Sequence, residues 1–324
     1  TDRTITLPDS TDTLIGSATT DALTTRINGA GGRKNLIING DMQVSQRGTY
    51  TTATAVTNSS YYLDRWKTWE VTTAHTIQQI VEGYSSNTNT QKVLVTTGAT
   101  GKSGSYQRFE SATKLRGREL TFSAMVRSNS PNARLMLYGA GDGWLGDSQY
   151  TGNGDWQKVT VNFTATTAIT TLDCYVALSG DVGASIALAT NDYIEFTQVQ
   201  LELGSVATDF EHRSYGEELA LCQRYYQKSY GENEYAADNL GNSSVSFIPT
   251  GGKYNVLFPY VMRAAPSIIT YRKNGGATSQ AQIDTNGGAY KTLNTGSINT
   301  KGFEVDASAS SSGYRFHYLA DAEL

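Results

Sequence analysis

The sequence predicts a mainly β protein: an N-terminal arm, an antiparallel β-sandwich of the jelly-roll type, a short linking helix and a smaller C-terminal β-sandwich. Short runs of alternating apolar and polar residues recur from residue 35 to the end, and clusters of Gly, Ser, Asn and Asp separate them. This spacing of turns is typical of antiparallel sandwiches and jelly rolls. No amphipathic stretch of three helical turns lies between the runs, which argues against a doubly wound α/β fold.

Composition limits the class of partner. The chain has 324 residues, enough for two domains with separate cores. Charged residues make up 17%, against roughly 25% in an ordinary globular protein. The formal net charge of −4 provides no basic surface for nucleic acid. No apolar run approaches the length of a membrane span. We therefore expect neither nucleic-acid binding nor membrane insertion.

Four segments follow from this patterning. Residues 1–34 are rich in Thr, Ser, Asp and Gly and have few large apolar side chains, so they are predicted to be an attachment arm that is ordered only by a partner. Residues 35–213 form the predicted jelly roll, 214–229 the linking helix, and 230–324 the C-terminal β-domain.

The linking helix carries an apolar stripe. Helical spacing over 217–227 places Leu219, Cys222 and Tyr226 on one face. A helix of about eleven residues does not persist alone in water. We therefore expect the stripe to be buried against symmetry mates or against the flanking domains, and we predict a homotrimer.

The sequence has no recognisable catalytic motif. His75, His212 and His317 lie far apart, and Cys174 and Cys222 have no CxxC spacing, so neither a zinc site nor a disulfide framework is predicted. GATGKSG at 98–104 resembles a phosphate-binding loop in composition, but a strand follows it rather than a helix, and a hairpin turn is predicted. We expect no catalytic residue, no metal site and no cofactor, and hence no enzyme.

One short segment is a candidate sugar site. GDGWLGD at 141–147 places Trp144 between two carboxylates, and flat aromatic rings cover the apolar face of a pyranose while carboxylates accept hydrogen bonds from its hydroxyl groups. Asp142 and Asp147 also form the best candidate pair for glycoside hydrolysis, although such acidic, Gly-rich segments are commonly solvated turns. Alternatively, Tyr138 packs in the core and Trp144 covers a loop. The predicted sugar-binding residues are Tyr138, Asp142, Trp144, Asp147 and Tyr150.

Structural calcium is a further possibility that the sequence leaves open. Calcium takes six to eight oxygen ligands. Asp41, Asp64, Asp192 and Glu195 are candidates to supply oxygens, although their spacing does not require an ion.

Several segments together resemble bacteriophage tail-fibre and receptor-binding proteins with a carbohydrate-binding-module-like jelly roll. They are NLIINGDMQVSQRG at 35–48, LDRW at 63–66, QRFE at 107–110, LTFSAMV at 120–126, VQLELGSVATDFEHRSYGEELALCQRYYQ at 199–227, MRAAPSI at 262–268 and the ending ADAEL. The opening NGDM is also similar to sugar-binding modules that start NGxFE and hold calcium there, but Gln43 stands where those modules carry Glu.

The resemblance implies a structural virion protein of a phage tail, located on the extracellular virion. It would recognise host cell-surface polysaccharide, mediate adsorption and join other tail proteins through its N-terminal arm. Two alternatives stay open: a virion adaptor or decoration protein that binds other phage proteins, and a polysaccharide-degrading tailspike enzyme.

Overall fold

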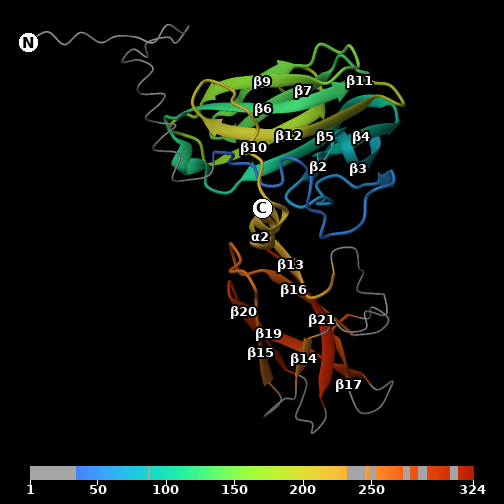
Figure 1. Cartoon of the computed structure of the whole chain (residues 1–324), viewed down its shortest axis with the longest axis vertical. Helices are drawn as coiled ribbons and strands as arrows, with labels where there is room; N and C mark the ends of the chain where they lie inside the picture. Colours follow the sequence, from blue (N-terminus) through green and yellow to red (C-terminus); the bar gives the residue numbers. More distant parts are fainter. Residues whose placement is uncertain are drawn as a thin grey trace, which may run out of the picture.

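The computed structural model of the chain describes residues 34–86, 88–231, 245–247, 253–272, 278–283, 290–306 and 313–324. The predicted arm, apart from Lys34, lies outside these ranges. The described part is mainly β, with antiparallel sheets in sandwich-like domains and one short α-helix, which confirms the predicted fold class (Figure 1). None of its helices is long and apolar enough to cross a membrane.

Two antiparallel sheets form the larger sandwich. The first sheet contains, in spatial order, β1 (Thr54–Ala55), β3 (Ala74–Ser85), β4 (Thr88–Thr97), β12 (Tyr193–Leu203), β6 (Glu119–Ser128) and β9 (Gln157–Thr164). The second contains β11 (Ile186–Leu188), β5 (Ala99–Phe109), β10 (Thr171–Leu178), β7 (Ala133–Ala140) and β8 (Gly143–Gln149), with β2 (Lys67–Val71) also paired to β5. Two 3-10 turns accompany them, η1 (Ala112–Leu115) and η2 (Asp181–Gly183).

Alternation along the strands builds the core between the two sheets. In β6 the side chains of Leu120, Phe122 and Val126 are fully buried against those of Phe196 and Leu201 in β12. The period of two residues in a strand places every second side chain on this inner face.

The linking helix is shorter than predicted. α2 spans Tyr215–Gln223 and begins with a capping box, in which Ser214 and Glu217 each accept a hydrogen bond from the other's backbone N–H. Tyr226 does not continue the helix, because residues 226–228 form β13 (Tyr226–Lys228) and pair with the last strand of the chain. The predicted helix over 214–229 is therefore wrong at its C-terminal end.

A second, smaller sandwich follows. One sheet contains β13, β21 (Tyr314–Asp321), β17 (Gln280–Ile283) and β18 (Tyr290–Thr292), with β14 (Val245–Phe247) and β16 (Ser267–Arg272) also paired to β21. The other contains β15 (Lys253–Leu257), β20 (Gly302–Asp306) and β19 (Asn294–Asn299). Phe303 and Val305 of β20 pack with Phe316 and Tyr318 of β21 in a core separate from that of the larger sandwich. The domain limits at 34/35, 213/214 and 229/230 remain predictions.

The chain ends back at the junction of the two sandwiches (Figure 1). The Glu323 carboxylate pairs with the guanidinium groups of Arg47 and Arg65 from the larger sandwich. Arg65 also lies 3.6 Å from the ring centroid of Tyr225, and Arg47 lies 3.9 Å from that of Tyr226. Tyr225, Tyr226 and the C-terminal tail thus bind the larger sandwich in one polar joint.

Candidate functional site

The outer face of the second sheet carries a cluster of aromatic side chains. In β10, Cys174 and Val176 point into the core, and Tyr175 between them points outward. Tyr175 lies opposite Tyr106 of β5 and Met136 of β7, which continue the outward row. We call the cluster the aromatic face; its rings belong to Trp69, Tyr106, Tyr138, Trp144 and Tyr175.

The rings form a continuous apolar surface. Tyr106 and Tyr175 stack at a centroid distance of 4.8 Å with 23° between their planes, and each is 8% exposed. Trp69 lies 4.8 Å and Trp144 lies 5.6 Å from Tyr175. Tyr138 meets Trp144 edge-on at 5.3 Å. The two central tyrosines are thus covered by Trp69, Trp144 and Tyr138, which are themselves half-buried and offer ring surface to solvent.

Two arginines bind three carboxylates at the polar rim of the aromatic face. Arg108 donates from Nε and Nη2 to the Asp173 carboxylate at 2.6 and 2.8 Å, and this bonding raises the pKa of the guanidinium. Arg134 pairs with both Asp147 and Asp181. The bidentate Arg108–Asp173 pair fixes both of its partners in one geometry. Burial raises the pKa of the Tyr106 and Tyr175 phenols, so both stay neutral hydroxyl groups at neutral pH.

The structure separates the five predicted sugar-binding residues. Tyr138 and Trp144 belong to the aromatic face, and Asp147 lies at its rim. Asp142, at the turn between β7 and β8, accepts a hydrogen bond from the Thr166 hydroxyl. Tyr150 is fully buried in the core and donates to the Asp155 carbonyl at 2.7 Å, so it has no surface to offer a ligand.

GDGWLGD is not a solvated loop. Most of it forms β8, and Trp144 packs against neighbouring rings. On one side it also contacts Gly183 of η2, where an added Cβ would come within 2.1 Å of the Trp144 ring. Gly183 has a φ of +72°, a conformation that favours glycine. The turn η2 therefore holds Trp144 in place at the edge of the aromatic face.

Sequence reasoning missed Trp69, Tyr106 and Tyr175. Their signal is large aromatic residues at the outward positions of alternating strands, as with Tyr175 between Cys174 and Val176. That signal does not say which strands are neighbours. The aromatic face exists because β2, β5, β10, β7 and β8 lie side by side, and this order follows only from the tertiary fold.

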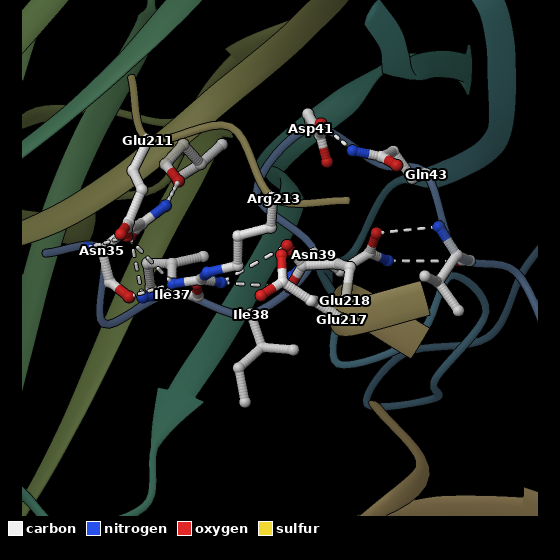
Figure 2. Close-up of polar contacts among 12 residues, drawn as sticks. Asn35, Ile37, Ile38, Asn39, Asp41, Gln43, Glu211, Arg213, Glu217 and Glu218 are labelled. Atoms are coloured by element: carbon white, nitrogen blue, oxygen red, sulfur yellow. Dashed lines mark hydrogen bonds and ion pairs between the residues drawn. The ribbon is translucent and has the colours of Figure 1, made fainter. Parts of the chain in front are cut away.

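The first residues of the jelly roll, 35–48, contact a buried cation, which is the guanidinium group of Arg213. The Arg213 side chain, 3% exposed, donates to the Ile37 carbonyl at 3.0 Å and to the Asn35 carbonyl (Figure 2). It also pairs with Glu218 at 3.1 Å and Glu211 at 3.5 Å. Glu218 accepts from the Asn39 backbone N–H at 2.6 Å. Backbone carbonyls and carboxylates are the oxygens that calcium would use, and here a guanidinium binds them.

The candidate calcium ligands do not converge. Asp41 accepts from Gln43, and its buried Oδ1 has no hydrogen-bond partner, so burial raises the pKa of this carboxyl. Asp64 accepts from Gln46 and Asp192 from the Ala189 N–H, while Glu195 pairs with Arg127. Across the described residues, no group of three or more His, Cys, Asp or Glu side chains could hold a metal ion. The four candidate side chains therefore do not form one calcium site in the described part of the chain.

The predicted helix stripe is divided between two elements. In α2, Cys222 is fully buried and Leu219 is half-buried. Tyr226 belongs to β13, and its ring lies beneath the Arg47 guanidinium. Beside the exposed side of α2, an open depression of about 690 Å³ is lined by Ala220, Leu221, Tyr260 and Val261 among others. Its lining shares no residue with the aromatic face. The stripe is covered largely within the chain.

No family model and no curated protein matches the sequence. Solved structures similar to part of the chain include the enzymatically active domain of tailspike protein 4 of Bacteriophage CBA120, with 11% identity and a TM-score of 0.34 over 46% of this chain and 21% of that one. The CBM22-1 xylan-binding domain of Paenibacillus barcinonensis Xyn10C has 12% identity and a TM-score of 0.32 over 54% and 99% of the two chains. The family 11 carbohydrate-binding module of Clostridium thermocellum Lic26A-Cel5E has 13% and 0.30, over 51% and 100%. Similarity at this level assigns no function.

Proposed function

We propose that the chain is a non-catalytic glycan-binding protein whose aromatic face receives a sugar. The observation that carries this is the gathering of five aromatic rings on the outer face of one sheet, in a cluster separate from the core between the two sheets. Their arrangement presents flat apolar surface beside fixed polar pairs, the combination that suits the apolar face and the hydroxyl groups of a pyranose.

The biological setting we propose is the virion of a bacteriophage, where the chain acts as a tail fibre in adsorption to host polysaccharide. It rests on the sequence resemblance over 35–48 and 199–227. The N-terminal arm would join other tail proteins. We propose a homotrimer, because single sugar sites are weak and joint engagement raises avidity by about 10²–10⁴. Light scattering at micromolar concentration tests the trimer, and a monomer mass would refute it.

The Trp69→Ala variant tests the aromatic face. Trp69 lies on β2 and leaves ring surface exposed, so its loss should weaken binding of the full chain to host polysaccharide by about 1–3 kcal/mol per site. Trp156→Ala is the matched control, because Trp156 contacts Tyr84 and Arg127 of the first sheet, on the other side of the sandwich. Thermal unfolding of both variants shows that each is folded at the temperature of the binding assay.

The outcomes separate the rival functions. Loss with Trp69→Ala alone supports the proposed site, and loss with Trp156→Ala alone moves the site to the first sheet. A chain that binds no glycan but captures another tail protein is an adaptor. Release of reducing ends from host polysaccharide would make it an enzyme; within the described residues, Asp142 and Asp147, the candidate acid pair, are each engaged by Thr166 or Arg134.

A further inference from the structure

Two lysines lie on either side of Trp69 on the aromatic face. Lys67 is two residues before Trp69 in β2 and lies opposite Tyr106. Lys102 of β5 comes from the other end of the same strand pair, two residues before Gly104, which lies opposite Trp69. The Lys67 Nζ is 5.8 Å from the Tyr106 ring centroid, and the Lys102 Nζ is 5.0 Å from the Trp69 centroid. The Lys102 ammonium therefore borders the Trp69 ring, on which a sugar would stack, and the Lys67 ammonium borders the Tyr106 ring of the same face.

These two charges are not neutralised within the described part of the chain. Neither ammonium has a carboxylate oxygen within 4.0 Å there, whereas the carboxylates of this face are each held by an arginine. Asp173 binds Arg108, and Asp147 and Asp181 bind Arg134. The two arginines balance two of these three carboxylate charges, so together with both lysines the face carries a formal net charge of +1, although the whole chain carries a formal −4.

A structural role for the lysines is the simpler alternative. An exposed ammonium over an aromatic ring contributes about 0.5–1 kcal/mol, and the long stem of lysine covers apolar surface. Lysines with this structural role alone would give no preference for a negatively charged ligand over a neutral or positively charged one. It does not account for arginines engaging every carboxylate of the face while both lysines stay unpaired, an arrangement that favours an incoming anion.

We propose that the glycan bound here is acidic, with a carboxylate or phosphate group on or beside the stacked ring that pairs with Lys67 or Lys102. This inference rests on the proposed function. The pyranose lies against Trp69, and the flexible lysine stem lets the ammonium turn from the aromatic ring to the anionic group. The arginines, already bound to carboxylates, keep the rim in shape.

The test uses paired ligands and the full chain. Host-type acidic polysaccharides and oligosaccharides are each presented beside a carboxyl-reduced or a dephosphorylated form of the same glycan. This pairing removes the charge, keeps the sugar backbone and distinguishes the two sources of negative charge. Affinities are measured for the natural chain, for the Lys67→Gln/Lys102→Gln double variant, and for Lys158→Gln. Lys158 is the matched control, because it lies in β9 of the first sheet, where its exposed ammonium donates a hydrogen bond to the Thr208 carbonyl.

We expect the natural chain and Lys158→Gln to bind an acidic glycan at least about tenfold more tightly than its neutral form, with the preference weakened by salt. The double variant should bind both forms within about twofold. Equal binding of both forms by the natural chain overturns this inference and leaves the proposed function standing. A preference that survives in the double variant also overturns it. Binding of no glycan by the natural chain refutes the proposed function itself.

Discussion

At the scale of single residues, one guanidinium organises the start of the jelly roll. Arg213 joins two backbone carbonyls of the opening segment to Glu218 of α2 and to Glu211. Removing one partner of a buried ion pair leaves an uncompensated charge and costs about 3–5 kcal/mol. Arg213 therefore supplies, from within the chain, the positive charge that a bound ion would otherwise bring to these oxygens.

Arg213→Met should lower the free energy of unfolding by about 3–5 kcal/mol in denaturant titrations, since it strands Glu218 and two carbonyls. Arg224→Met is the control: its side chain is 42% exposed in its pair with Glu110, and we expect a loss of no more than about 1 kcal/mol. Chelator should leave the melting temperature of the natural chain unchanged. A chelator-induced drop would mean that a metal ion contributes to the fold.

His75 should make the fold sensitive to mild acid. Burial lowers its pKa to about 4, from an ordinary value of 6.5. The unfolded chain therefore binds a proton at this residue below about pH 6.5 while the fold does not, so its contribution to stability is present above pH 6.5 and is lost as the pH falls to 4. Asp64 acts in the opposite direction, because burial raises its pKa to about 6.

The His75 effect is isolated by comparison with His75→Leu, which retains the Asp64 contribution. Between pH 6.5 and 4 the natural chain should lose about 2–3 kcal/mol of unfolding free energy relative to the variant. Urea titrations at several pH values measure this difference. A difference that stays constant with pH would contradict the assignment to His75.

At the scale of elements, alternation identified most strands, and two failures have physical causes. GATGKSG at 98–104 is predicted to be a hairpin turn because a strand rather than a helix follows it, but β5 runs from Ala99 to Phe109. The glycine at 104 serves close packing of two strands rather than a turn, because an added Cβ there would lie 2.3 Å from the Cβ of Ala177 in the neighbouring strand. Tyr226 matches helical spacing, yet its backbone pairs with Asp321, nearly a hundred residues later.

The candidate site was only partly predictable, because it too depends on the pairing of strands that are far apart in the sequence. Trp144 and Tyr138 were found through a local segment, whereas Trp69 and Tyr175 join them through strand neighbours far apart in sequence. The alternation of residues along a strand shows which side chains point away from the core. Sheet order decides which of them meet.

The start of α2 gives an element-scale prediction. Ser214→Ala removes the side-chain acceptor for the Glu217 N–H and should cost about 1 kcal/mol of unfolding free energy. Glu217→Gln is the control, since glutamine can also accept the return bond from the Ser214 N–H and should cost less. Equal losses in denaturant titrations of the two variants would indicate that charge at this helix end matters more than the capping bond.

At the scale of the whole molecule, the polar joint decides whether the two sandwiches behave as one body. Glu323 is 4% exposed and serves two guanidinium groups of the larger sandwich, of which Arg65 is 1% exposed. The joint also includes a hydrogen bond from the Tyr61 hydroxyl to the Leu324 carbonyl at 2.6 Å. The last residues of the chain thus connect the two sandwiches, so the aromatic face of the larger sandwich keeps a defined orientation relative to the smaller one.

Glu323→Ala should therefore do more than destabilise. It leaves buried Arg65 without its carboxylate, and we expect a loss of about 3–5 kcal/mol. Because the two cores are separate, the two sandwiches of the variant should unfold in two resolved calorimetric transitions, whereas those of the natural chain should unfold more nearly together. The radius of gyration of the variant, measured by small-angle scattering, should exceed that of the natural chain. Glu304→Ala is the control, as its partner Lys253 is 59% exposed at 2.8 Å, and it should cost at most about 1 kcal/mol. If both variants scatter and melt like the natural chain, the Glu323 carboxylate is not what holds the sandwiches together, and the remaining contacts of the joint, which include the Arg47–Asp321 ion pair and the Tyr61–Leu324 hydrogen bond, must set their orientation.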